Sequence, residues 1–337
     1  MKNKKIIIAG GSGFIGQELC NYFGEHNDLV ILGRQLPNQE TNSFGEDHLK
    51  KGVKKKIRFV QWDGRTTGDW VDELEGADLL INLVGKTVNC RYTQKNKQEI
   101  FDSRTNATKV LGEAIQICRN PPALWINAAS STIYPHATDT PRDEHFTDFH
   151  DDFSVQVCQL WEKTFFEQAT AFTRKIALRM AITLGPGSVM IPYFNLLKFG
   201  LGGQQGNGKQ MYSWIHVLDT CRMIDWITEH SDLEGVYNCC SPGPVTNNMF
   251  MKTLRKETGY IFGLPAYSWM LKIGAALIGT ETELILKSRW VLPTKICETG
   301  FEFTHGVLKD AIHDIISKTP RSQYHLFGSK TVNIYEA

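Results

Sequence analysis

The chain has 337 residues, with 37 lysines and arginines against 36 acidic residues, so its formal net charge is only +1. This balance creates no global field that would attract nucleic acid or an anionic membrane. The basic run at 50–56 has no interleaved aromatic residues, which is typical of a solvated loop. We therefore expect a soluble protein of one large or two modest domains, with no nucleic-acid and no membrane partner.

The eight cysteines form no CxxC pair, and most of them lie in apolar segments, where a thiol behaves as a small hydrophobe. This pattern predicts reduced thiols and a cytoplasmic location. His145 and His150 lie in a charged loop at 138–152, and their spacing is not a recognised ligand spacing. A solvated loop is the favoured interpretation, and we expect no metal site.

The stretch 5–19 contains an apolar run, then glycines, then apolar residues at helical spacing, which predicts a strand, a tight turn and the start of a helix. Glycines three residues apart allow a sharp turn and bring backbone N–H groups against a pyrophosphate at the helix N-terminus. An ordinary strand–helix turn is the alternative. A second strand at 28–32 supplies the βαβ context that favours dinucleotide binding. The candidate contacts in this turn are Gly10, Ser12, Gly13, Phe14, Ile15 and Gly16.

The second strand ends at Gly33 and Arg34, about twenty residues past the glycine turn, where an NAD-selective site places a carboxylate on the ribose 2′-hydroxyl. A guanidinium at this place can pair with a 2′-phosphate. The pattern favours NADP over NAD. The alternative is a surface arginine that merely follows a strand.

Further strands are predicted at 57–63, 77–85 and 124–129, with a long helix at 93–118. Asp63, at the end of the third strand, could accept from the adenine amino group or simply start a turn. The glycine end of the fourth strand, at Gly85, would let backbone approach the adenosine half. The fifth strand leads into the hydroxyl-rich stretch 130–135, which lies where such sheets bind ligands.

A helix at 155–171, a sixth strand at 175–183 and a seventh strand at 236–240 follow, and the stretch beyond Pro242 is mostly helical. These elements predict an α/β fold, a Rossmann doubly wound parallel sheet with a smaller, mainly helical C-terminal substrate-side domain. The expected division is residues 1–185 with about 207–240 for the nucleotide-binding domain, 186–206 with 241–320 for the cap, and 321–337 for a polar tail.

The motifs GGSGFIG, INLVG, SSTIYP, LRMAITLGPG and WIHVLD follow one another in an order that resembles the extended short-chain dehydrogenases/reductases, which include nucleotide-sugar epimerases and dehydratases. The resemblance covers about residues 4 to 316. Within that group the chain is most similar to the atypical epimerase-like family described as SulA or cell-division-inhibitor homologues. The stretches that carry this similarity are 91–104, 200–219, 244–250 and 291–303.

The resemblance implies an NADP-binding domain with a C-terminal substrate-side domain. It places Gly33 and Arg34 at the 2′-phosphate, and Leu83 and Val84 at the adenosine. Glu99 and Arg104 would then lie on the helix beside the cofactor, where a guanidinium adds a fixed charge near the pyrophosphate or ribose. Relatives often pair through two long helices, here 93–118 and 154–171, so a homodimer is an open expectation.

The chain departs from the family in the Tyr-x-x-x-Lys pair that moves the proton. Alignment on the family pattern puts Ser154 in the tyrosine slot and Cys158 in the lysine slot, and a thiol supplies no cation. Ser130 matches the catalytic serine slot. Tyr134 or His216 could act as proton donor, with the alternative that Tyr134 packs and His216 supports the loop beneath the sheet.

Two functions stay open. One is an NADP(H)-dependent, epimerase-like oxidoreductase acting on a small polar metabolite such as a sugar or nucleotide-sugar carbonyl, with Ser130 and Tyr134 as catalytic candidates. The other is a non-catalytic NADP(H)-binding sensor or interaction protein. A Ser-His-Asp hydrolase is set aside, because Ser130 has no flanking glycines.

Overall fold

The computed structural model describes residues 1–35, 56–187, 189–271, 281 and 286–326. Its centre is a seven-stranded sheet in the order β10-β6-β5-β4-β1-β2-β3, with every neighbouring pair parallel. The strands are β1 (Lys5–Ala9), β2 (Asp28–Gly33), β3 (Lys56–Gln61), β4 (Leu79–Asn82), β5 (Leu124–Ser130), β6 (Arg174–Met180) and β10 (Gly235–Cys239). The order runs outward from β1 in both directions, which confirms the predicted doubly wound α/β fold.

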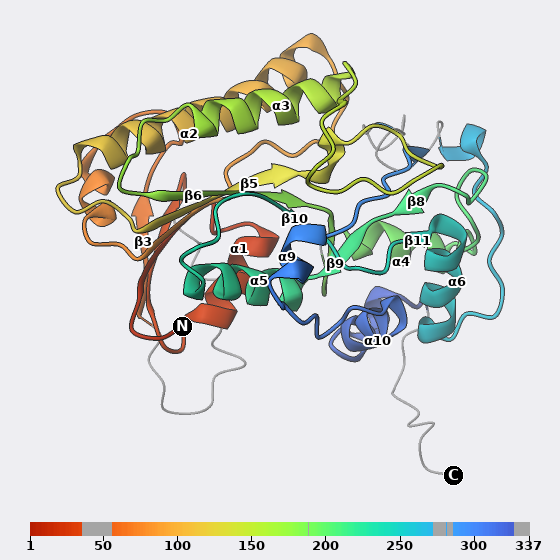
Figure 1. Ribbon diagram of the computed structural model, residues 1–337. Coiled ribbons are helices and arrows are strands. Elements are labelled where there is room, and N and C mark those ends of the chain that lie inside the picture. The colour runs from red at the N-terminus through yellow and green to blue at the C-terminus, as the bar shows by residue number, and fades with distance from the viewer. Residues whose placement is uncertain (36–55, 188, 272–280, 282–285, 327–337) are drawn as a thin grey trace.

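Helices cover both faces of this sheet (Figure 1). The helices α2 (Gln94–Ile117) and α3 (Phe153–Phe166) pack on one face, and α1 (Phe14–Phe23) and α5 (Val217–Glu229) pack on the other. Each face of the sheet therefore has its own hydrophobic core, as expected for strands that read as nearly continuous apolar runs.

The first strand illustrates how the sequence specifies this layering. Ile6 and Ile8 belong to the core under α1 and α5, whereas Ile7 and Ala9 belong to the core under α2 and α3. All four side chains are fully buried. Successive strand residues point to opposite faces, so a buried central strand needs apolar residues at every position.

A second unit lies beyond the carboxyl ends of the strands. The helices α4 (Met190–Lys198), α6 (Asn247–Thr258) and α10 (Leu308–Ser317) share one apolar core. Tyr212 and Trp214 fall in the 207–240 segment expected with the nucleotide-binding domain, yet their side chains lie in this second core. They belong to short strands that pair in two small sheets, namely β8 (Met211–Tyr212) with β11 (Val245–Thr246) and β9 (Trp214–His216) with β7 (Ile182–Leu184).

The predicted strand at 175–183 is wrong as a single element. The N–H of Ala181 still donates to the Cys239 carbonyl, but that of Ile182 donates to the Ser213 carbonyl instead. The chain thus leaves the main sheet after β6 and enters the small sheet as β7. The predicted helix at 155–171 also ends early, at Phe166. The described residues also form the short helices η2 (Asp69–Leu74), η3 (Ser131–Ile133), α9 (Thr294–Glu298) and η4 (Arg321–Gln323).

Three stretches of the sequence interpretation lie outside the described residues: the basic run up to residue 55, part of the helical C-terminal stretch, at 272–280 and 282–285, and the end of the polar tail, from 327. The described cysteines are all free thiols. Within the part of the chain that the structure describes, no helix has both the length and the apolar character needed to cross a bilayer.

Candidate functional site

The glycine turn between β1 and α1 is held by close backbone contacts. Gly10 has φ +79°, and a Cβ there would lie 3.1 Å from the carbonyl carbon of Leu83 and 3.2 Å from the nitrogen of Val84. A Cβ on Gly16 would lie 2.4 Å from the Cα of Gly11. Only glycine satisfies both positions, because one needs a left-handed conformation and the other has no room for a side chain.

The N-terminus of α1 is open for an anion. Gly13 is the N-cap, no side chain caps the helix, and its first turn contains no acidic residue. Among the residues that the structure describes, the nearest neighbour of an added Cβ on Gly13 would be the Gly10 carbonyl oxygen, at 3.7 Å, so none of them fills the space beside Gly13. Uncapped N–H groups at the positive end of a helix dipole bind phosphate. We call the glycine turn at 10–13 and the first turn of α1 the cofactor cradle. This cradle therefore fits the pyrophosphate of a dinucleotide.

The neighbouring candidates of this turn have different surroundings. Ser12 is exposed, and its carbonyl accepts a hydrogen bond from Gln17. Ile15 packs against the core under α1. A Cβ on Gly185 would lie 2.6 Å from the ring of Phe14, so this ring rests on the chain just after β7. Phe14 and Ile15 thus position the first turn of α1.

The ends of β2 and β3 lie side by side at the edge of the cradle. A Cβ on Gly33 would lie 3.0 Å from the Phe59 ring, and the Arg34 side chain that follows is exposed. Asp63 accepts hydrogen bonds from the N–H groups of Arg65 and Thr66 and from the Thr66 hydroxyl. These bonds, first of all that from the Thr66 N–H, lower the pKa of Asp63. The structure favours the turn role that the sequence left open for Asp63.

Arg104 on α2 lies against the end of β4. A Cβ on Gly85 would lie 3.2 Å from the Arg104 Cζ, and the guanidinium stands 5.1 Å from the centre of the Trp161 ring. Its Nη1 donates to the carbonyls of Lys86 and Ile100, at 3.0 and 3.1 Å. Burial lowers the pKa of Arg104. A cation is thereby held at the carboxyl edge of the sheet by neutral partners.

Glu99, five residues before Arg104 on α2, forms an ion pair with Lys86. The hydrogen bond from the Lys86 ammonium is the main reason why the pKa of Glu99 is lowered. The Glu99 carboxylate therefore orders the segment after β4 through Lys86. The Arg104 guanidinium donates to backbone carbonyls instead.

A buried polar network fixes α2 and α3 to the strand ends. Asn82 donates to the Oδ1 of Asn127, at 2.7 Å, and to the Oγ1 of Thr108, at 3.3 Å. The indole N–H of Trp161 donates to the same Thr108 hydroxyl at 3.1 Å. The sequence interpretation missed this network. The sequence did contain a signal for it, since Asn82 and Asn127 each lie in a strand made mainly of apolar residues. A buried amide needs hydrogen-bond partners, so two such residues indicate a polar network.

Ser130 ends β5 and is half-buried. Its Oγ accepts the N–H of Thr132 and lies 2.9 Å from the Thr132 hydroxyl, which in turn lies 3.2 Å from the Cys158 sulfur. Burial raises the pKa of Cys158 to about 11, so this thiol is neutral at neutral pH. The residue in the lysine slot thus provides a weak hydrogen-bond partner and no charge.

The structure argues against Tyr134 as a proton donor. Its side chain has no exposed surface, its hydroxyl donates to the Asn238 Oδ1 at 2.9 Å, and it accepts from the Arg179 Nη1 at 2.8 Å. Burial raises its pKa to about 12. Arg179 in turn makes two 2.8 Å hydrogen bonds to Glu162. Tyr134 therefore packs in a buried hydrogen-bonded group, which is the alternative that the sequence left open.

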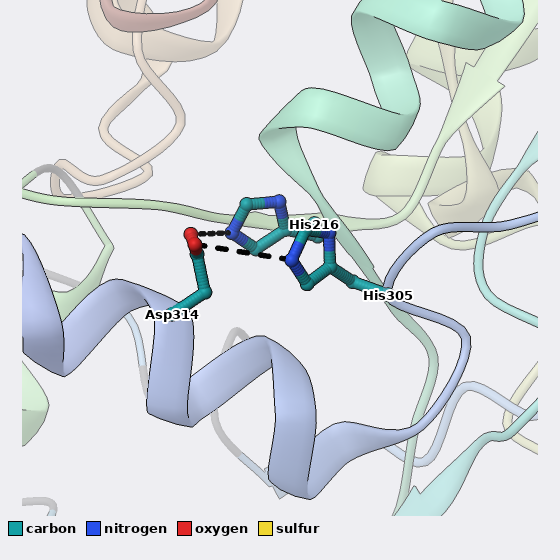
Figure 2. A group of neighbouring side chains, drawn as sticks. All are labelled: His216, His305 and Asp314. Carbon is teal, nitrogen blue, oxygen red and sulfur yellow. Dashed lines mark ion pairs between the residues drawn. The ribbon is translucent and has the colours of Figure 1, made fainter.

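His216 likewise supports the structure. Figure 2 shows it with His305 and Asp314, which come from the segment before α10 and from α10 itself. The His216 Nε2 lies 3.1 Å from the Asp314 Oδ2, and the two imidazole rings contact each other at a tilt of 31°, with centroids 4.1 Å apart. Burial is the main reason why the pKa of His216 falls to about 4. This cluster fastens α10 to the start of α5, so His216 has the supporting role that was the alternative to proton donation.

Distances alone would allow His216, His305 and Asp314 to hold a metal ion, because one donor atom from each lies within 4.8 Å of the others. The tautomer of His216 argues against this. Its Nδ1 accepts the N–H of Leu218 at 3.2 Å, so the proton of the neutral ring is on Nε2, the atom that faces Asp314. A metal-bound histidine instead donates through its other nitrogen. We therefore interpret the group as a structural clamp, in which ion-pair distances and the ring contact join the three side chains.

With this geometry in place, comparison with known proteins identifies the family. Residues 6–240 match the model of the NAD dependent epimerase/dehydratase family, which is more than half of the chain. The chain belongs to the NAD-dependent epimerase/dehydratase family. Residues 268–315 of this family member also match a domain of unknown function, DUF1731.

The resemblance to epimerase family proteins extends along 93% of the chain. Epimerase family protein YfhF of Bacillus subtilis is 31% identical over 319 residues, covering 93% of this chain and 98% of the relative. Epimerase family protein SERP0438 of Staphylococcus epidermidis is 29% identical over 316 residues, covering 93% and 99%. The solved structure of human epimerase family protein SDR39U1 with NADPH has a TM-score of 0.78 at 24% identity, covering 93% and 99%. At that identity the structural likeness establishes the fold.

Proposed function

We propose that this epimerase family member binds NADP(H) and uses it as an oxidoreductase on a small polar substrate, for example a sugar or nucleotide sugar. The open N-terminus of α1 carries the proposal, since it offers uncapped N–H groups beside the unfilled space at Gly13. The exposed Arg34 at the end of β2 supports the phosphorylated cofactor, because a guanidinium pairs well with a 2′-phosphate. The human relative solved with NADPH adds support.

Each candidate contact has a part in this proposal. The turn before α1 receives the pyrophosphate, Gly33 and Arg34 receive the 2′-phosphate, and the chain after β4 lies along the adenosine. Glu99 orders that chain through Lys86, and Arg104 supplies the fixed cation at the edge of the sheet. Asp63 shapes the turn at the adenine end. The residues proposed to contact or to shape the cofactor site are Gly10, Ser12, Gly13, Phe14, Ile15, Gly16, Gly33, Arg34, Asp63, Leu83, Val84, Gly85, Glu99 and Arg104.

Bound nicotinamide would supply the hydride transfer, so the chain must position the substrate and handle a proton. Ser130, at the carboxyl end of β5, is the proposed catalytic residue. Its hydroxyl can donate to a substrate oxygen while it accepts from the Thr132 N–H. The Thr132 hydroxyl lies close enough to exchange a hydrogen bond with it. Tyr134 is omitted from the proposed chemistry, because its hydroxyl is fully engaged inside the protein.

Replacing Arg34 by glutamate is expected to reverse cofactor preference. The carboxylate repels a 2′-phosphate and can accept from a free 2′-hydroxyl, so the ratio of NADPH to NADH affinity should fall at least about a hundredfold. Fluorescence titration with both nucleotides measures this ratio. The matched control is Arg65→Glu, a nearby exposed arginine, which should leave the ratio unchanged. An unaltered affinity ratio in the Arg34 variant would show that Arg34 does not contact the 2′-phosphate.

Ser130→Ala is expected to lower kcat about a hundredfold for any carbonyl substrate whose reduction consumes NADPH. The variant lacks one hydrogen-bond donor to the negative charge that develops on the carbonyl oxygen. Loss of NADPH absorbance across a panel of sugars and small carbonyl compounds provides the assay. Tyr134→Phe is the comparison: it should reduce stability through the lost Arg179 and Asn238 hydrogen bonds but leave kcat within a few-fold. Equal losses of kcat in both variants would contradict the assignment.

A second function is favoured by one specific observation. Ser154 and Cys158 lie on α3, four residues apart, where the family pattern would place tyrosine and lysine, and the Cys158 thiol is buried and neutral. A protein that holds NADPH without turnover would need neither of those groups. Such a binder would saturate with NADPH yet show no absorbance loss with any substrate of the panel.

A further inference from the structure

Exposed apolar side chains gather at one place in the C-terminal unit. Ile261 and Phe262 are 85% and 84% exposed, and Phe199, Leu264, Tyr267 and Trp269 are each more than half exposed. The chain here runs from α6 along the outer edge of the molecule (Figure 1). Single exposed hydrophobic residues are ordinary, whereas several in one short segment mark an interaction surface. We call residues 261–269 the apolar rim.

The apolar rim is held in place by backbone hydrogen bonds. The N–H of Leu264 donates to the Gly200 carbonyl at 2.8 Å, and its carbonyl accepts the N–H of Gly203 at 2.9 Å. Two further bonds, at 2.9 Å each, join Ala266 to Gln204 and Gly206. A Cβ on Gly263 would lie 2.6 Å from the Gly202 carbonyl carbon, so the two segments are in close contact. The outward position of the rim is therefore built into the fold.

A basic hollow adjoins the rim. It has a volume of about 400 Å³ and is lined by Lys252, Arg255, Lys256, Gly259, Tyr260 and Ile261. Three of these residues are cationic, and none of the described lining residues is a carboxylate. Lys252 and Lys256 are exposed, while Arg255 donates to the Gly202 carbonyl at 2.5 Å. Because the whole chain carries a net charge of only +1, this positive charge is a local feature.

We propose that the apolar rim and the basic hollow together dock the protein peripherally on an anionic lipid surface. The lysines would pair with lipid headgroups, Ile261 and Phe262 would enter the boundary of the acyl chains, and Tyr267 and Trp269 suit the interfacial region. A second copy of the chain fits less well, because two like-charged hollows would face each other. This role is separate from cofactor binding, because the rim and hollow lie on α6 and the segment after it, whereas the proposed cofactor site lies around β1 and β2.

Co-sedimentation with vesicles tests the proposal. The full chain should bind vesicles of phosphatidylcholine with about one third phosphatidylglycerol at least tenfold better than pure phosphatidylcholine, and rising salt should weaken binding. The double variant Ile261→Ser, Phe262→Ser should lose about tenfold or more of that affinity. Lys252→Glu with Lys256→Glu should abolish the preference for the anionic vesicles.

Phe172→Ser is the matched control, because Phe172 is 88% exposed but lies before β6, outside the rim. This variant should bind vesicles like the wild type, and all variants should keep the wild-type circular dichroism and NADPH affinity. Three results would overturn the proposal. The first is no vesicle binding by the wild type, and the second is an equal loss of vesicle affinity in the rim variant and the Phe172 control. The third is a wild-type dimer in sedimentation analysis that the rim variant does not form.

Discussion

Replacing Glu162 by glutamine is expected to lower the free energy of unfolding by about 3–5 kcal/mol. The side chains of Arg179 and Glu162 are only 6% and 10% exposed, and two hydrogen bonds of 2.8 Å join them. Burial alone would lower the pKa of Arg179, but the hydrogen bonds and charge of Glu162 outweigh it and raise that pKa. Removal of the carboxylate leaves a buried, uncompensated guanidinium. Urea unfolding followed by circular dichroism measures the loss.

Glu73→Gln provides the control for this effect. Glu73 also makes two hydrogen bonds to an arginine, Arg58, but that arginine side chain is 47% exposed. Solvent screens such a pair, so its loss should cost less than about 1 kcal/mol. Equal losses in the free energy of unfolding for the two substitutions would show that burial does not determine how much the Arg179–Glu162 pair contributes to stability.

Gly16→Ala is expected to disrupt the cofactor cradle, with a loss of about 3 kcal/mol in stability and at least a hundredfold loss of NADPH affinity. The added methyl would lie 2.4 Å from the Gly11 Cα and 2.5 Å from its carbonyl oxygen, so the helix must move away from the turn. The N–H groups of the first turn of α1 would then no longer converge on the phosphates. Urea unfolding measures the free energy of unfolding, and NADPH titration of the same preparation measures the affinity.

Gly13→Ala separates cofactor contact from folding. Its methyl would have no neighbour closer than 3.7 Å in the described part of the chain, so the stability should change by no more than about 1 kcal/mol. It would nevertheless occupy the space assigned to the pyrophosphate, and NADPH affinity should fall about tenfold. An unchanged affinity in this variant would mean that the phosphates bind elsewhere.

The layered fold was predictable from the sequence because buried parallel strands leave a strong signal. The apolar run that contains Ile6, Ile7 and Ile8 could only be a strand covered on both faces, and the glycines after it marked the turn into α1. The long helix predicted at 93–118 is found at Gln94–Ile117, where Thr93 caps it by accepting the Asn96 N–H. Local patterns were sufficient for these elements.

Long-range partners left no such signal. The exit of the chain from the main sheet at Ala181 depends on which carbonyl the Ile182 N–H meets, and that partner, Ser213, is distant in sequence. Tyr134 was a candidate because of its place after Ser130, yet its role is decided by Arg179 and Asn238, which come from two other strands. Motif spacing places a residue on an element, but only tertiary packing decides what surrounds it.

Isothermal titration of the wild-type protein with NADPH and then with NADH tests the central claim most directly, since the phosphates are assigned to the open N-terminus of α1 and the 2′-phosphate to Arg34. The expected result is one saturable site that binds NADPH at least about tenfold more tightly than NADH. Absence of NADPH binding, or equal affinity for the two nucleotides, would contradict the claim.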